Sequence, residues 1–199
     1  MGSISSCCEP QESIPVAKPQ DDDRSIRLVI VGETTVGKTC LITNFNTSAF
    51  STEHIPSVLD VFRGTRDIGD HQVKIEIVDT SGDSLLGSNR QLVYGNTDCF
   101  MLCVAFNNRD SLDRVMNFKN EIRSENQDAP VVLVGTKSDM RDGEEDCLTK
   151  EDLDQQSIEH GFSDTLETSS KNWQDKNVKK AFNRAIKLAY YWKYPAALQ

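Results

Sequence analysis

A short glycine-containing segment that ends in lysine and threonine carries the clearest chemistry in the sequence. Residues 32–39 read GETTVGKT, which matches the phosphate-loop pattern GxxxxGK(S/T). The glycines let the backbone wrap around a phosphate chain, Lys38 can neutralise the β- and γ-phosphates, and the hydroxyl of Thr39 can bind Mg²⁺. The segment predicts a nucleotide site with magnesium, formed by Gly32, Thr35, Val36, Gly37, Lys38, Thr39 and Cys40.

A second polar segment is expected to select the base of the nucleotide, because the phosphate loop alone does not distinguish guanine from adenine. Residues 136–139 read TKSD and directly follow an apolar run. The carboxylate of Asp139 can accept hydrogen bonds from the N1–H and the exocyclic amino group of guanine, a pair of donors that adenine does not present. Adenine would leave this carboxylate unpaired, at a cost of about a few kcal/mol. Thr136, Lys137 and Asp139 are therefore predicted to bind guanine, and an ATP-dependent phosphotransferase is the disfavoured alternative.

These motifs need a scaffold, and the apolar pattern predicts an α/β fold. Strands are expected at 26–31, 58–65, 73–78, 99–106, 131–134 and 164–168, with a turn at Gly69 and Asp70. Helical spacing appears at 112–122, where Asp110 or Ser111 can cap the first turn, and at 178–189, before Pro195. This alternation predicts a mostly parallel six-stranded sheet with one antiparallel edge strand and helices on both faces. Each motif follows a strand, where such sheets bind ligands.

Composition limits the remaining possibilities. The chain has 199 residues and a net charge of −9, so a nucleic-acid partner is not expected. Its six cysteines form no CxxC pair, and no apolar run approaches the roughly 20 residues of a membrane span. We expect a flexible N-terminal tail over 1–24, one domain over 25–194 and a short C-terminal tail over 195–199.

The order of the motifs resembles that of Ras-superfamily GTPases, over about residues 26–192. The resemblance implies that Asp79 of the DTSG segment holds Mg²⁺ through water and that the Gly82 N–H meets the γ-phosphate. It also implies that the ETSSK segment at 167–171 touches the guanine oxygen through its last three residues, which are Ser169, Ser170 and Lys171.

The resemblance also covers two loops that would respond to the γ-phosphate, at about 50–60 and 79–96. Phe50 falls where the family places an aromatic ring against guanine, although a plain core or surface aromatic is the alternative. Ser57 takes the place of the threonine that binds Mg²⁺. IPSVLDVF and TDCFMLCVAF resemble Rho proteins and LETSSKN resembles Rab proteins, which makes the chain Rho-like and divergent. A monomer is implied that signals to effectors in cytoskeletal or membrane-traffic regulation and is loaded by exchange factors.

The catalytic positions depart from the family pattern. Asp83 follows the DTSG glycine, where the family has a glutamine that orients the attacking water. Thr34 replaces a glycine that leaves room for that water, although many Rab-like proteins tolerate a small hydroxylated residue there. Lys38, Asp83 and Thr34 are the expected catalytic positions, and slow hydrolysis of GTP is expected. The alternative is a binding module that stays loaded with GTP, as in the Rnd-type proteins.

The N-terminus reads MGSISSCC, which matches the pattern for N-myristoylation at Gly2 followed by palmitoylation at Cys7 and Cys8. One myristoyl chain binds membranes only marginally, whereas a second lipid gives stable attachment. The last residues carry no cysteine for prenylation, in agreement with an anchor at the other end. We expect the protein at the cytoplasmic face of a membrane or in the cytosol; a chance tail or an expression scar is the alternative.

Overall fold

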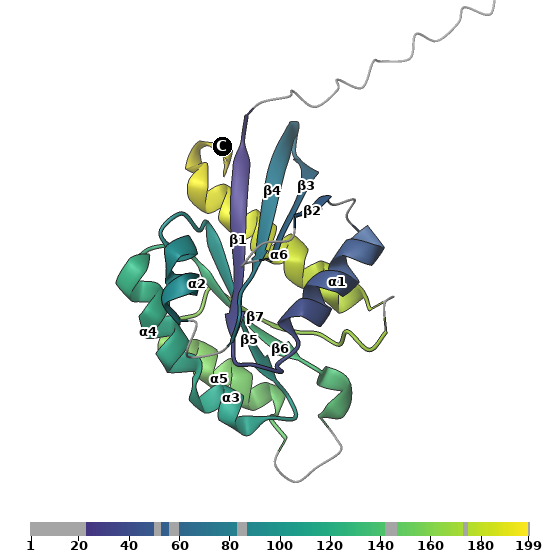
Figure 1. Cartoon of the computed structure of the whole chain (residues 1–199), viewed down its shortest axis with the longest axis vertical. Coiled ribbons are helices and arrows are strands. Elements are labelled where there is room, and N and C mark those ends of the chain that lie inside the picture. The colour runs from purple at the N-terminus through teal and green to yellow at the C-terminus, as the bar shows by residue number, and fades with distance from the viewer. Residues whose placement is uncertain are drawn as a thin grey trace, which may run out of the picture.

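The computed structural model describes residues 23–49, 53–55, 60–82, 87–141, 147–172 and 175–198. They form a single twisted sheet with helices packed on both faces (Figure 1). The strand order is β2-β3-β4-β1-β5-β6-β7, in which β3 runs antiparallel to its two neighbours and β4, β1, β5, β6 and β7 are parallel. The strands are β1 (Ser25–Gly32), β2 (Glu53–Ile55), β3 (Asp60–Ile68), β4 (His71–Asp79), β5 (Cys99–Ala105), β6 (Val131–Thr136) and β7 (Asp164–Glu167).

The helices divide between the two faces of the sheet. α1 and α6 supply the apolar side chains of one core cluster, while α2, α3, α4 and α5 supply those of the other. None of the described helices is both long and apolar enough to cross a bilayer. The helices are α1 (Lys38–Ala49), α2 (Gly87–Tyr94), α3 (Arg109–Asp113), α4 (Val115–Glu125), α5 (Lys150–His160) and α6 (Lys176–Lys193), with short 3₁₀ turns η2 (Ser138–Met140) and η3 (Pro195–Leu198).

β1 lies in the middle of the sheet because its side chains are apolar on both sides. Leu28 and Ile30 belong to the core under α1 and α6, whereas Val29 and Val31 belong to the opposite core. All four are fully buried. A continuous apolar run of this kind is typical of a central parallel strand, and its end leads directly into the glycine-containing loop.

The predicted fold class is confirmed, and all six predicted strands are present. A seventh strand, β2, pairs antiparallel with β3, so β3 is not the edge strand. The pattern missed β2 because three residues are too few to show an alternation. The predicted turn between β3 and β4 is present, and Gly69 adopts a positive φ of 61° there.

The predicted helix cap at Asp110 or Ser111 is wrong. α3 begins at Arg109, and both residues lie inside it. The buried Ser111 hydroxyl donates to the carbonyl oxygen of Asn108 at 2.6 Å and accepts from the N–H of Ala105 at 3.0 Å. The bond from Ala105 ties α3 to the end of β5, and the bond to Asn108 holds the residue that precedes the helix.

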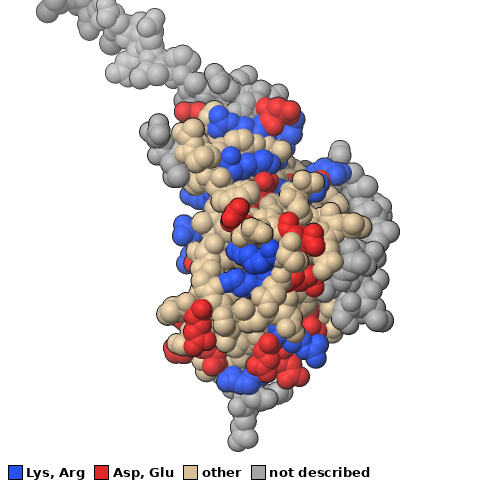
Figure 2. Space-filling model, turned by 90° about the vertical axis from the view of Figure 1, so that its left-hand side faces the viewer, with Lys and Arg blue, Asp and Glu red and all other residues tan. Residues whose placement is uncertain are grey.

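The face that carries α2 and α4 has a mixed surface. Figure 2 shows lysine and arginine side chains interspersed with aspartate and glutamate in small groups on this face. Because the signs alternate, electrostatic contributions there come from individual ion pairs rather than from a broad field.

Candidate nucleotide site

The loop between β1 and α1 has a backbone that only particular residues allow. Gly32 has a φ of 141°, and a Cβ on it would overlap the carbonyl oxygen of Cys103 on β5. This close approach requires glycine. Thr35 also has a positive φ, of 63°, in the exposed turn that follows. The backbone therefore curves sharply as it leaves the sheet, as the phosphate-loop prediction requires.

Lys38 lies at the first position of α1 and is almost fully buried, with 7% of its surface exposed. Its ammonium donates hydrogen bonds to the carbonyl oxygens of Gly32, at 3.0 Å, and Glu33, at 2.7 Å. The Lys38 side chain thus reaches back from the end of the loop to its beginning. A buried ammonium held among backbone carbonyls is well placed to attract phosphate oxygens.

Asp79, at the end of β4, supplies a carboxylate with one oxygen left over. The Thr39 hydroxyl donates to Oδ2 of Asp79 at 2.5 Å. The other oxygen, Oδ1, is buried and has no hydrogen-bond partner among the described residues. Burial raises the pKa of this carboxyl, while the Thr39 bond and the Lys38 charge oppose the rise. A hydroxyl beside an unsatisfied buried carboxylate oxygen fits Mg²⁺, which prefers such oxygen ligands.

Gly82 brings the segment after β4 against the phosphate loop. A Cβ on Gly82 would overlap the backbone of Glu33 and Thr34. The buried hydroxyl of Thr80 donates to the carbonyl oxygen of Ile30 at 2.7 Å and holds the same segment to β1. The two motifs, about 50 residues apart in the sequence, therefore share one contact surface.

Asp139 lies in η2, directly after β6, and is held by the loop that follows β7. The Ser169 hydroxyl donates to its Oδ1 at 2.5 Å, and Nζ of Lys171 lies 3.7 Å from its Oδ2. The hydrogen bond from Ser169 keeps the pKa of the Asp139 carboxyl below its ordinary value, so it is ionised at neutral pH. An oriented carboxylate of this kind can accept from two adjacent N–H donors of a base.

Comparison with known proteins agrees with this geometry. The model of the Ras family matches residues 27–191. The chain belongs to the Ras family. It is similar to the "Ras-like GTP-binding protein RhoL" of Drosophila melanogaster, with 33% identity over 82% of this chain and 86% of the relative. It is also similar to the "Ras-like GTP-binding protein RHO1" of Entamoeba histolytica, with 31% identity over 77% of this chain and 72% of the relative. It is a Rho-like small GTPase.

The Rho-like GTPase connects its phosphate loop to residues 136–139 and 167–172, which together we call the base loop, through buried polar groups. The hydroxyl of Thr136 contacts the carbonyl oxygens of Val36, in the phosphate loop, and Val104, on β5. The Thr136 side chain therefore holds the phosphate loop against the end of β6. On the other side of the site, the side-chain amide of Asn44 donates to the carbonyl oxygen of Asn172 at 3.1 Å and joins α1 to the base loop.

The structure places the predicted site residues as follows. Gly32, Lys38, Thr39, Asp79 and Gly82 meet at the phosphate loop, and Asp139, Ser169 and Lys171 meet at the base loop. The side chains of Thr34 and Thr35 are exposed, as is that of Cys40 on the first turn of α1, while Val36 is buried. Lys137 adopts a left-handed backbone, with a φ of 54°, that turns the chain into η2. The predictions for Gly2, Cys7, Cys8, Phe50, Ser57 and Asp83 lie outside the described residues.

Sequence reasoning missed three residues that support the site. Glu33 supplies a carbonyl to Lys38, Asn44 joins α1 to the base loop, and Asp175 accepts from the N–H of Ser169 at 3.0 Å. Asp175 also caps α6 by accepting from the N–H of Asn177 at 2.9 Å. A cap before a helical pattern is recognisable from the sequence. The Glu33 carbonyl lies inside the phosphate loop that the sequence identifies, whereas the contact of Asn44 with the distant Asn172 has no local signal.

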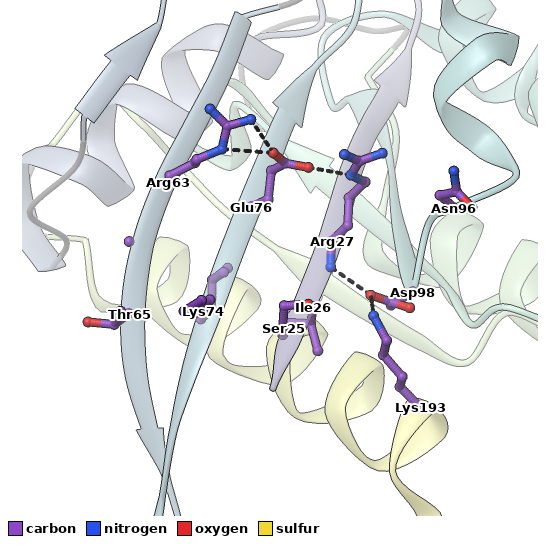
Figure 3. Close-up of a pocket in the computed structure, with 12 residues that line it drawn as sticks. Ser25, Ile26, Arg27, Arg63, Thr65, Lys74, Glu76, Asn96, Asp98 and Lys193 are labelled. Atoms are coloured by element: carbon purple, nitrogen blue, oxygen red, sulfur yellow. Dashed lines mark hydrogen bonds and ion pairs between the residues drawn. The ribbon is translucent and has the colours of Figure 1, made fainter. Parts of the chain in front are cut away.

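A hollow of about 940 Å³ lies elsewhere on the protein, at the start of β1 (Figure 3). Arg63, Glu76 and Arg27 lie side by side across β3, β4 and β1, and the single carboxylate is bonded to both arginines. Lys193 pairs with Asp98 at 3.0 Å, and Asp98 also accepts from the backbone N–H of Arg27 at 2.8 Å. The phosphate loop follows the other end of β1, so this hollow is separate from the nucleotide site.

Proposed function

We propose that this Rho-like GTPase binds GTP and GDP with Mg²⁺ and signals to effectors through the loops at about 50–60 and 79–96. The observation that carries the proposal is the unsatisfied buried oxygen of Asp79 beside the hydroxyl of Thr39. Lys38 would hold the phosphates and Asp139 the guanine. Bound Mg²⁺ would supply positive charge to the phosphate oxygens.

We further propose that hydrolysis is slow. Asp83 cannot provide the paired donor and acceptor with which a glutamine amide orients water, and its charge would repel an attacking hydroxide. The Thr34 side chain would occupy space next to the γ-phosphate. The intrinsic rate should therefore fall below the family baseline of about 10⁻⁴ per second.

The second candidate is a binding module that stays loaded with GTP and recruits partners without a working cycle. Asp83 is the feature that favours it. The two candidates differ in the nucleotide that the protein carries when isolated, because a module that does not hydrolyse GTP retains it.

The test is to extract the nucleotide from freshly purified protein and to measure single-turnover hydrolysis of GTP at saturating Mg²⁺. Bound GDP with a slow measurable rate supports the switch, and bound GTP with no turnover supports the module. An Asp83→Gln variant should hydrolyse faster in either case. A wild-type rate at or above the baseline contradicts the role given to Asp83, and tight binding of ATP in competition contradicts guanine selection.

We also propose that the N-terminus anchors the protein to the cytoplasmic face of a membrane through Gly2, Cys7 and Cys8. There it would act on effectors in cytoskeletal or membrane-traffic regulation. A Gly2→Ala variant expressed in eukaryotic cells should move to the soluble fraction, since stable attachment takes more than one lipid signal and this variant loses the myristoyl group. A Ser3→Ala variant is the matched control, because it changes the adjacent residue and keeps the myristoylation pattern. Unchanged membrane association of Gly2→Ala contradicts the anchor.

A further inference from the structure

Glu33 makes three separate contacts at the start of the phosphate loop. Its carbonyl oxygen accepts from the Lys38 ammonium at 2.7 Å, and its backbone lies against Gly82. Its carboxylate forms an ion pair with Nη1 of Arg114 at 3.2 Å; the Glu33 side chain is 20% exposed and the Arg114 side chain 56%. One residue therefore links the lysine that would hold phosphate, the glycine that would sense it and an arginine from another part of the fold.

Arg114 reaches this position because the helix breaks there. It lies between α3 and α4, where it ends one helix and starts the next with φ −88° and ψ −3°. Its own N–H donates to Asp110 at 3.2 Å, and its carbonyl accepts from Asn117 at 3.0 Å. The helix on its N-terminal side is fixed to β5 through the buried Ser111. Arg114 thus extends from a rigid platform.

The other end of the ion pair is also confined. Gly32 is pressed against Cys103 of β5, so the chain that enters Glu33 has little freedom to move. The backbone is held by packed structure at both ends of the ion pair, so less conformational entropy is lost in forming it than for a pair on mobile loops.

We propose that Arg114 is a positioning residue for the nucleotide site, which holds the Glu33–Thr34 peptide in place through the Glu33 carboxylate. That peptide is the surface against which Gly82 packs. Because Gly82 would bind the γ-phosphate, the pair should affect the triphosphate state more than the diphosphate state. The inference rests on the proposed binding of guanine nucleotides.

The test compares release rates of a fluorescent GDP and a fluorescent non-hydrolysable GTP analogue from the wild type, Arg114→Gln and Glu33→Gln. Loss of the pair should speed release of the GTP analogue about five-fold in both variants, and release of GDP less. Arg109→Gln is the matched control, since Arg109 lies on α3, the helix that ends at Arg114, in an ion pair with Asp152 at 3.4 Å. Its release rates should stay at the wild-type values.

The direction of the two effects separates positioning from a general electrostatic field. Removing a positive charge near bound phosphates speeds release through the field, whereas removing a negative charge slows it. Faster release from both variants, with a changed ratio of the GTP-analogue rate to the GDP rate, therefore supports positioning. Opposite directions, or a ratio unchanged in both variants, overturn it.

Two further outcomes complete the test. If the variants do not fold, wild-type protein at about 1 M salt decides, because screening beyond about 3 Å weakens the pair. If the ratio of the GTP-analogue release rate to the GDP release rate does not change with salt, the inference is overturned. If wild-type protein binds neither nucleotide, the proposed function itself fails. Wild-type binding with unaltered variants removes only the role of Arg114.

Discussion

Replacement of Asp139 by asparagine tests the base loop most directly. The carboxylate has two acceptor oxygens, one held by Ser169 and one near Lys171. The Asp139→Asn variant keeps the shape of the side chain, but one oxygen becomes an amino group that faces the N–H donors of guanine. The Ser169 bond to Oδ1 can persist, so the loop should keep its conformation.

The size of the effect follows from the two hydrogen bonds to guanine. A hydrogen bond to a charged group contributes about 1.5–3 kcal/mol. The Asp139 side chain is 26% exposed, so the lower value applies to each bond. The loss is then about 3 kcal/mol, or about a hundred-fold in the dissociation constant of GDP.

Isothermal titration of nucleotide-free protein with GDP in Mg²⁺ measures this change. Asp154→Asn is the control, because Asp154 lies on α5 in an exposed ion pair with Lys150 at 3.0 Å and should leave GDP affinity unchanged. Xanthosine diphosphate carries an oxygen in place of the guanine amino group, so the Asp139→Asn variant should bind it better than the wild type does. The reasoning is refuted if Asp139→Asn binds GDP within two-fold of the wild type.

Three further predictions follow from the packing and charges. Gly82→Ala should lower the free energy of unfolding by about 1–3 kcal/mol, because the added Cβ overlaps the Glu33 backbone. Urea unfolding at a fixed nucleotide concentration measures this loss, and an unchanged unfolding midpoint contradicts the prediction. Burial raises the pKa of Asp79 above 3.8, so Mg²⁺-free protein should gain stability as the pH falls through the raised pKa. Unfolding curves measured at several pH values should show this gain for the wild type and lack it for Asp79→Asn. Glu76→Gln should lower the free energy of unfolding in urea by about 1 kcal/mol, because it leaves two arginines side by side without their carboxylate. The release rates of the fluorescent nucleotides should stay unchanged, because the hollow is separate from the nucleotide site.

The local patterns were sufficient for the architecture. Val29 and Val31 in a continuous apolar run predicted a central strand, and the helical spacing at 178–189 predicted α6, because both depend on periodicity along the chain. The short β2 and the cap of α3 were not recoverable in this way. β2 exists only because β3 offers it a partner, and Ser111 bonds to β5 as well as to the residue that precedes its own helix.

The sequence by itself determined which residues can do chemistry. The spacing from Gly32 to Thr39 and the carboxylates of Asp79 and Asp139 predict a guanine nucleotide site, because backbone freedom, charge and hydrogen-bonding capacity are properties of residue types. The same holds for the substitution at Asp83.

Only the tertiary structure decided how these residues support one another. The contact of Gly82 with the phosphate loop, the bond from Thr136 to Val36 and the ion pair of Glu33 with Arg114 join segments that are about 50, 100 and 80 residues apart. No local sequence pattern encodes contacts between segments that lie so far apart in the chain. They arise because parallel strands deliver their carboxyl ends to one edge of the sheet, where side chains from separate loops meet.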